Sequence, residues 1–300
     1  NTFDMPNASL ITARDARHIA ITGRGVIDGG HPEELGVRID DGRRPEFRWK
    51  TITFENCRYV QITGVTMRDM EGWTVGLRGC EFVFIDTVSI HSNFRRVNTD
   101  GIQIGGCRDV HVSNCSLIMG DDAFALFASR DKPCERITIT NCTMESAASG
   151  IKIGGFHQNF RDITVSNCVM RNCMVGVGFY TKGEGCVERV LFSNLTIGTI
   201  DDLTSVNEVI RNQVVPIFMD IDAWHHVPGT ATVRDVQFSN VVIDSEFGVL
   251  IQGMDDNPIR NLTMRDITFR VRGVGDYAQR KKPSGFWDDT PETAAKRTSV

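Results

Sequence analysis

The chain has 300 residues, of which 41% are hydrophobic and 24% are charged, and its 28 glycines outnumber its 9 prolines. This composition excludes a disordered or fibrous protein and fits a turn-rich chain with a large core. A net charge of −5 without a dense Lys/Arg block argues against nucleic acid as a partner, and the absence of an apolar run of 18 residues argues against a membrane span.

One short pattern begins to recur at residue 62: an apolar residue, a polar one, Asn or Asp, a small apolar residue, a polar one and an apolar one. Weak copies start at Ile62 and Ile85, and six clear copies follow. Their Asn or Asp lies at Asn114, Asn141, Asn167, Asn194, Asn240 and Asp266, in steps of 27, 26, 27, 46 and 26 residues. The alternation within each copy is that of a strand. A period near 26 residues predicts an all-β protein, a single-stranded right-handed parallel β-helix of roughly nine coils stacked about 4.8 Å apart.

The domain organisation follows from this repeat. We expect the β-helix to occupy residues 1–274 and a non-repeat tail to occupy residues 275–300. A solenoid must cover the sheet edge at each end, and residues 1–7 are too short for the helix that usually does so. A second subunit is one candidate cover, which leaves a homo-oligomer open.

Two columns of the repeat predict structural roles. The recurring Asn residues are expected to form a ladder of side-chain amides that hydrogen-bond between coils at a turn. Cys115, Cys142 and Cys168 share the next, inward position. They are interpreted as small core residues, because the nine cysteines lack the spacing of a zinc site or a disulfide scaffold.

A second strand register predicts where the chemistry lies. It includes the strands at residues 100–105, 122–127 and 149–154, whose inward residues are apolar, so that the alternate residues face outward. Asp100 and Asp122 then share one outward column on neighbouring coils, and Asp121 lies at the turn before Asp122. Carboxylates this close raise the pKa of at least one of them. Glycoside hydrolysis uses such a protonated acid beside an ionised partner, with roughly 6.5 to 9.5 Å between them in inverting enzymes. A calcium site and turn-capping aspartates are the alternatives that these residues leave open.

The motifs in this repeat resemble those of glycoside hydrolase family 28, the polygalacturonases and their relatives. Asn98–Ile102 reads NTDGI, and Gly120–Ala123 reads GDDA. The segments Ile21–Gly29, Gly72–Thr74 and Val214–Asp220 are also similar to that family, so the likeness spans residues 8 to 272.

The resemblance implies inverting hydrolysis without a cofactor or metal, with Asp121 as the general acid and with Asp100 and Asp122 holding and activating the water. The implied partner is a pectin-related or other acidic polysaccharide or oligosaccharide. The implied location is secreted or periplasmic, although Asn1–Leu10 does not have the pattern of a signal peptide.

The chain departs from the family at two places. The family has Gly-His-Gly where this chain has Ala148–Gly150, and Arg-Ile-Lys where it has Gly178–Tyr180. Those cations are expected to hold a galacturonate carboxylate, so standard polygalacturonate is not the expected substrate. We expect Lys152 to replace part of the lost charge and Tyr180 to stack on a sugar face. His157 is the candidate to take over the task of the missing histidine.

Further substrate contacts are expected around the carboxylates. The candidate residues are Asn98, Gln103, Arg96 on the groove rim beside Arg95, Asp220 and His225. The loops at residues 31–49 and 198–214 are expected to form groove walls. Two other functions stay open: a lyase or epimerase that uses Lys152 with Arg95 or Arg96, and a glycan-binding module without catalysis.

Overall fold

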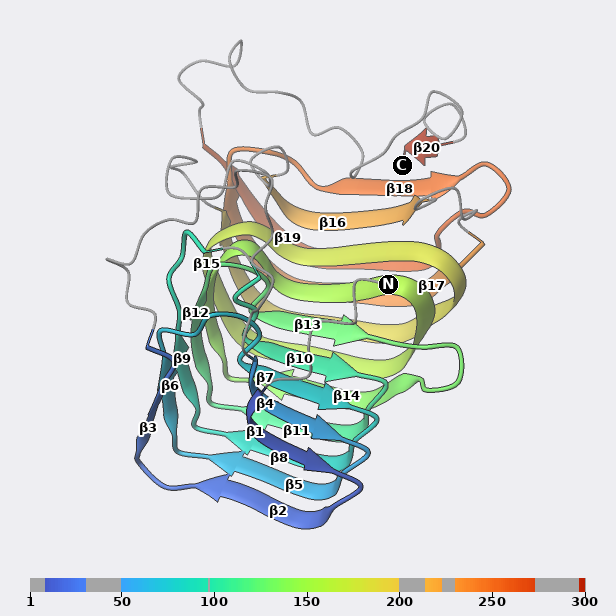
Figure 1. The fold of residues 1–300 in the computed structure, drawn as a ribbon. Coiled ribbons are helices and arrows are strands. Elements are labelled where there is room, and N and C mark those ends of the chain that lie inside the picture. Colours follow the sequence, from blue (N-terminus) through green and yellow to red (C-terminus); the bar gives the residue numbers. More distant parts are fainter. Residues whose placement is uncertain are drawn as a thin grey trace, which may run out of the picture.

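The computed structural model describes residues 9–30, 50–96, 98–199, 214–222, 230–272 and 297–299. These residues form strands and turns without a helix. The chain winds into stacked coils, each of which contributes one strand to each of three parallel sheets (Figure 1). The predicted parallel β-helix is confirmed. None of the described residues belongs to a helix that is long and apolar enough to cross a membrane.

The first sheet carries the candidate site and follows the coils in order. Its strands are β1 (Ser9–Arg14), β4 (Lys50–Glu55), β7 (Val75–Arg78), β10 (Ile102–Gly105), β13 (Phe124–Phe127), parts of β15 (Thr143–Thr199), β16 (Val215–Asp222) and β18 (Leu250–Met254). Each pairs in parallel with the strand one coil later. The short β20 (Arg297–Ser299) adds an antiparallel edge to β18. The rest of the predicted tail at residues 275–300 lies outside the described residues.

The second and third sheets continue each coil. The second contains β2 (Arg17–Thr22), β5 (Arg58–Thr63), β8 (Glu81–Asp86), β11 (Arg108–Ser113), β14 (Cys134–Thr140) and parts of β15, β17 (Thr232–Ser245) and β19 (Arg260–Val271). The third contains β3 (Val26–Asp28), β6 (Thr66–Arg68), β9 (Ser89–His91), β12 (Ser116–Met119) and the remaining parts of β15, β17 and β19. Because β15 keeps its hydrogen bonds through the bends, it runs through two coils without a break.

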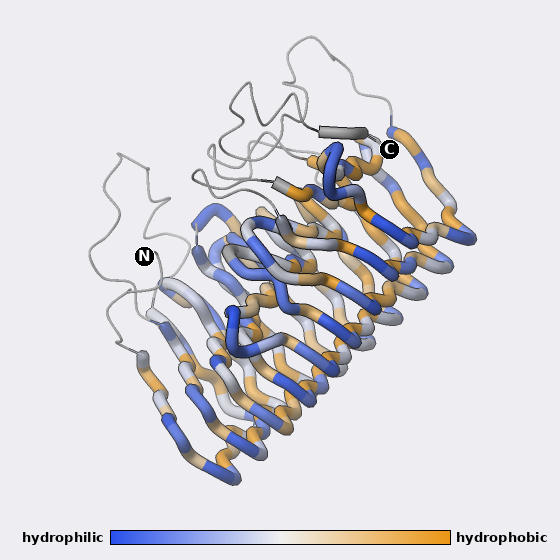
Figure 2. The backbone as a smooth tube through the Cα atoms, turned by 90° about the vertical axis from the view of Figure 1, so that its right-hand side faces the viewer, coloured by the Kyte–Doolittle hydropathy of each residue, from blue (hydrophilic) through white to orange (hydrophobic). Residues whose placement is uncertain are grey.

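The core is the inside of the coils. Hydrophobic and hydrophilic residues alternate along each coil (Figure 2), and the inward side chains are almost fully buried. Cys115, Cys142 and Cys168 are buried free thiols, as predicted. A second buried set, which the repeat did not reveal, lies at the turn between the first and second sheets and comprises Cys57, Cys80, Cys107 and Cys134. All of them pack as small apolar side chains.

The asparagine ladder is present at the turn between the second and third sheets. Its asparagines have φ near 55°, in the left-handed region that Asn tolerates better than most residues. Asn194 Nδ2 donates to Asn167 Oδ1 at 2.9 Å, and Asn240 Nδ2 donates to Asn194 Oδ1 at 2.8 Å. The ladder therefore stabilises both the turn and the stacking of coils.

Candidate active site

Three aspartates meet where two neighbouring strands of the first sheet begin. Backbone hydrogen bonds continue in register from Asp100, before β10, to Asp122, before β13, and on to Ser149. Asp100 is 5% exposed, Asp122 is 2% exposed and Asp121 is half-buried. One carboxylate oxygen from each of the three lies within 4.8 Å of the others. The sequence prediction that these groups cluster is confirmed.

The turn that carries Asp121 depends on a glycine. A Cβ atom at Gly120 would lie 2.2 Å from the carbonyl oxygen of Arg96 and 2.4 Å from that of Asn93. Only a residue without a side chain lets the preceding loop pack so closely. Ser146 Oγ also donates to the carbonyl of Asp121 at 2.7 Å, which ties the turn to the next coil.

Each carboxylate has its own set of donors. Asp121 Oδ2 accepts from the backbone N of Asn98 at 2.8 Å and from Asn98 Nδ2 at 3.2 Å, and its Oδ1 accepts from the backbone N of Asp122 at 2.9 Å. Asp122 accepts from Lys152 Nζ at 2.7 Å and from the backbone N of Ser149 at 3.2 Å. Asp100 Oδ2 accepts from Gln103 Nε2 at 2.8 Å.

The crowding changes the acidity of the cluster. Burial, followed by the negative charge of Asp122, raises the pKa of Asp121 to about 6, although Lys152 and the donors at Asn98 and Asp122 oppose the rise. Burial and the two neighbouring carboxylates raise the pKa of Asp100 well above its ordinary value. Burial alone would lower the pKa of Lys152, but Asp122 and Asp121 outweigh it, so its pKa is raised and the ammonium stays charged. The cluster can therefore hold a proton near neutral pH beside an ionised carboxylate.

Lys152 and Tyr180 form one unit on this face. Lys152 Nζ lies 5.4 Å from the centroid of the Tyr180 ring and 5.7 Å from that of Phe127. The Tyr180 hydroxyl lies 3.0 Å from Ser149 Oγ, and its ring packs against Phe218 at 5.2 Å. Tyr180 is only 5% exposed. The expectation that Tyr180 stacks on a sugar face is therefore wrong, because these neighbours cover the ring.

Gly178 explains why Tyr180 can lie there. A Cβ atom at Gly178 would come within 2.5 Å of the Tyr180 ring. The ring of Tyr180 thus occupies the space that a side chain at Gly178 would need. The family pattern has Arg and Lys where this chain has Gly178 and Tyr180, and the structure shows that these two differences depend on each other.

The three carboxylates lie close together, as the shared column and turn predict. Their nearest oxygens lie within 4.8 Å of one another, whereas the acid and base of an inverting pair are typically roughly 6.5 to 9.5 Å apart. The separation rule alone does not predict the stereochemical outcome here, since three carboxylates share the site.

Three other predicted contact residues are described by the structure. The Arg96 side chain is 13% exposed and pairs with Glu71 Oε1 at 3.2 Å, so it braces the loop and does not form an exposed rim. Asp220 is 2% exposed and lies in register with Tyr180, one coil later. His157 Nδ1 lies 3.9 Å from Glu184, beyond the far end of the strand that Asp122 precedes. The structure therefore does not bring His157 to the carboxylates. His225 and both predicted groove walls, apart from residues 198–199 and 214, lie outside the described residues.

Sequence reasoning missed the contribution of Ser149. Its backbone N and its hydroxyl connect Asp122 with Tyr180, across two coils. The column of Asp100 and Asp122 contains Ser149 as its next member, so extending that column by one coil would have found it.

The carboxylates have the donor type for a divalent cation. However, the Lys152 ammonium already lies 2.7 Å from Asp122 Oδ2, where a cation would bind. The site fits an internal ion pair better than a metal.

Comparison with known proteins gives a consistent family. The chain matches the family model described as "Glycosyl hydrolases family 28" over residues 3–282. A probable polygalacturonase of Arabidopsis thaliana is 25% identical over 88% of this chain and 57% of its own length, and an exopolygalacturonase of Platanus acerifolia is 22% identical over 87% and 69%. A further probable polygalacturonase of Arabidopsis thaliana is 24% identical over 72% of this chain and 48% of its own length, so the chain spans about half the length of the two Arabidopsis relatives.

Solved structures show the same fold. A hyperthermoactive exopolygalacturonase from Thermotoga maritima aligns with a TM-score of 0.59 and 19% identity, over 86% of this chain and 71% of its own. An endo-xylogalacturonan hydrolase from Aspergillus tubingensis aligns with a TM-score of 0.58 and 14% identity, over 89% and 74%. At these identities the likeness supports the β-helix alone.

Proposed function

We propose, since this chain belongs to family 28 of the glycosyl hydrolases, that it hydrolyses glycosidic bonds in a pectin-related, acidic polysaccharide. The observation that carries the proposal is the meeting of Asp100, Asp121 and Asp122, each of which places a carboxylate oxygen within 4.8 Å of the others. Burial and the charge of Asp122 raise the pKa of Asp121 to about 6. A carboxylic acid that holds its proton near neutral pH can protonate a leaving oxygen. A structural turn would not need three carboxylates at one point.

In the proposed reaction, Asp121 donates its proton to the glycosidic oxygen as the bond to the sugar carbon breaks. Asp122 and Asp100 hold a water molecule, and Asp122, whose carboxylate is paired with Lys152, takes the proton of that water as its oxygen bonds to the sugar carbon. Both oxygens of Asp122 already accept hydrogen bonds, one from Lys152 and one from Ser149. These two donors hold Asp122 in place, and we propose that it acts as a base on water, so that the configuration at the sugar carbon is inverted.

The charge at the site bears on the substrate. The ammonium of Lys152 is engaged by Asp122 at 2.7 Å. An additional uronate carboxylate beside these aspartates would meet like charge, and in the part of the chain that the structure describes the ammonium of Lys152 is already paired. We therefore propose that the sugar at the cleaved bond is neutral or esterified, within a polymer that carries uronates elsewhere. Such polymers occur outside cells, so we propose a secreted or periplasmic protein.

The lyase alternative needs a base that can give up its proton near neutral pH. The pKa of Lys152 is raised, as described above. Burial, with the charge of Asp122, also raises the pKa of Tyr180. Neither group suits the role of base, so hydrolysis is the better-supported function.

The test compares the wild type with Asp121→Asn on polygalacturonate, methyl-esterified pectin and neutral pectic side chains. Reducing ends measure cleavage, and NMR of the anomeric proton gives the configuration of the product. We expect cleavage of the esterified or neutral substrates, inversion, and a loss of roughly 10²- to 10⁴-fold in Asp121→Asn. Asp256→Asn, which changes an exposed aspartate in a turn, is the matched control. Full activity of Asp121→Asn, or an unsaturated product that absorbs near the ultraviolet edge, would overturn the proposal.

A further inference from the structure

A row of aromatic side chains crosses the second sheet at its N-terminal coils. The rings of His18 and Tyr59 stack at 4.7 Å with an interplanar angle of 6°, and those of Tyr59 and Phe82 stack at 5.1 Å and 10°. The three residues come from β2, β5 and β8 and share one left-handed backbone position, with φ of 54°, 58° and 55°. This row lies on a different sheet from the carboxylates.

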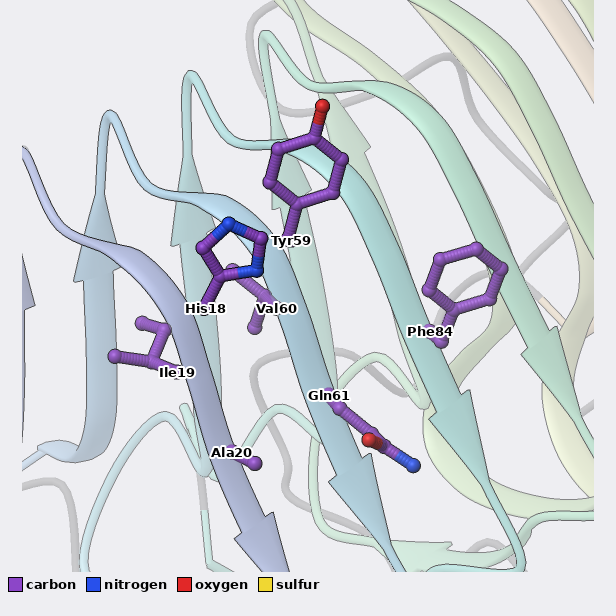
Figure 3. A pocket seen from close by; sticks show the side chains of 7 residues that line it. All are labelled: His18, Ile19, Ala20, Tyr59, Val60, Gln61 and Phe84. Atoms are coloured by element: carbon purple, nitrogen blue, oxygen red, sulfur yellow. The ribbon is translucent and has the colours of Figure 1, made fainter.

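A second row beside it leaves one ring face open. Phe84 stacks on His111 at 5.3 Å. On the other side of Phe84, the same column contains Gln61 and Ala20, so a shallow hollow of about 260 Å³ opens there, and His18 and Tyr59 line it as well (Figure 3). Tyr59 is 43% exposed and Phe84 is 49% exposed. The hollow therefore combines the open face of Phe84, the amide of Gln61 and the edge and hydroxyl of Tyr59, whose two ring faces are covered by His18 and Phe82.

The fold does not require aromatic rings at these turns. Farther along the chain, the same left-handed position is occupied by charged residues that pair between coils. Arg136 binds Asp109 at 2.7 Å, and Arg189 binds Asp162 at 2.7 Å. This charged ladder makes the same turn without exposing apolar surface. Exposed aromatic rings grouped at one end therefore suggest a binding role.

Two arginines accompany the rings. The guanidinium of Arg58 lies 5.9 Å from the Tyr59 centroid and 5.5 Å from the Phe82 centroid, and it also pairs with Glu81 at 3.2 Å. Arg17, which is exposed, lies in register with Arg58 on the previous coil. A sugar ring presents an apolar C–H face that packs on an aromatic ring, and its hydroxyls suit an amide such as Gln61. A negatively charged sugar would also be attracted by the two arginines.

We propose that this hollow between Tyr59 and Phe84 is a second, non-catalytic binding site for a uronate-bearing polysaccharide. It holds the polymer on the second sheet while the carboxylate cluster acts on the first. The choice of polymer rests on the proposed function, whereas the binding itself does not require turnover.

The test uses affinity electrophoresis in native gels that contain polygalacturonate. The protein carries Asp121→Asn throughout, so that the polymer is not consumed. We compare it with versions that add Phe84→Ala or Tyr59→Asn. Asn suits the left-handed position, which Asn261 occupies in the same column. The matched control adds Val242→Ala, since Val242 is 46% exposed and belongs to β17.

We expect each platform change to weaken binding at least tenfold, and the Val242 change to leave it unaltered. In the otherwise wild-type chain, Phe84→Ala should not change the hydrolysis of short oligosaccharides. Equal retardation of all variants, or no retardation of the parent protein, would overturn the second site. Equal retardation in neutral glycan gels would overturn its preference for uronates. Because the parent lacks the general acid, these outcomes are independent of whether the wild type hydrolyses any substrate.

Discussion

Substituting Gly178 by Ala tests the link between Gly178 and Tyr180. The added Cβ would lie 2.5 Å from Cε2 and 2.9 Å from Cζ of the Tyr180 ring, whereas carbon atoms pack at about 3.5 to 4.0 Å. The ring must therefore move by about 1 Å, in a space bounded by Phe218 and Lys152. Overpacking of this kind costs about 1 to 3 kcal/mol.

The same movement breaks the hydrogen bond between the Tyr180 hydroxyl and Ser149, which contributes about 1 kcal/mol. We therefore expect Gly178→Ala to lower the free energy of unfolding by about 2 to 4 kcal/mol in total. Urea unfolding followed by circular dichroism measures this change, with unfolding midpoints compared at equal slope.

A double-mutant cycle makes the reasoning refutable. In the Tyr180→Ala background the ring that a Cβ at Gly178 would overlap is gone. Gly178→Ala should then lower the free energy of unfolding by less than about 1 kcal/mol. If Gly178→Ala is equally destabilising with and without the ring, the two positions are not linked in this way. The explanation of the paired departure would then fail.

Three further predictions concern acidity, the loop and the ladder. The general acid must be protonated, so kcat/KM should fall as pH rises through about 6, the pKa of Asp121. Lys152→Met removes a cation that lowers the pKa of Asp121, so the fall in kcat/KM should shift to higher pH. A fall at unchanged pH would contradict the assignment of Asp121 as the general acid. Arg96→Met removes the pairing with Glu71, which should cost about 2 to 3 kcal/mol. It should lower kcat without a selective rise in KM for acidic substrates, because Arg96 positions the loop of Asn98. Asn194→Ala should lower the free energy of unfolding by about 2 to 4 kcal/mol, because it removes two hydrogen bonds of the ladder and places Ala at a left-handed φ. Asn194→Gly should lower it less, because Gly tolerates that φ. Thermal unfolding of both variants measures the difference.

The sequence predicted those features that repeat along the chain. The coil period, the inward Cys115 column, the asparagine ladder and the approach of Asp100 to Asp122 all follow from one regular step. Each of them is a consequence of register, and register is visible in the spacing of residues.

Features that depend on one side chain filling the space of another were not predictable. The burial of Tyr180 depends on the absence of a side chain at Gly178, two residues earlier in the same strand. The bracing role of Arg96 depends on Glu71, which is separated by 25 residues and belongs to no repeat. Such contacts depend on rotamers and local volume, which the spacing of residues does not encode.

The buried thiols have a consequence for the chemical durability of the protein. All nine cysteines are free, and eight of them are buried, with Cys186 alone partly exposed. Burial raises the pKa of the Cys134 thiol to about 12, and the thiolate is the form that reacts with oxidants and disulfides. An oxidising medium therefore meets one partly accessible thiol in the folded protein. The remaining eight become reactive only as coils separate, so the order in which they react with a thiol reagent would record which end of the stack opens first.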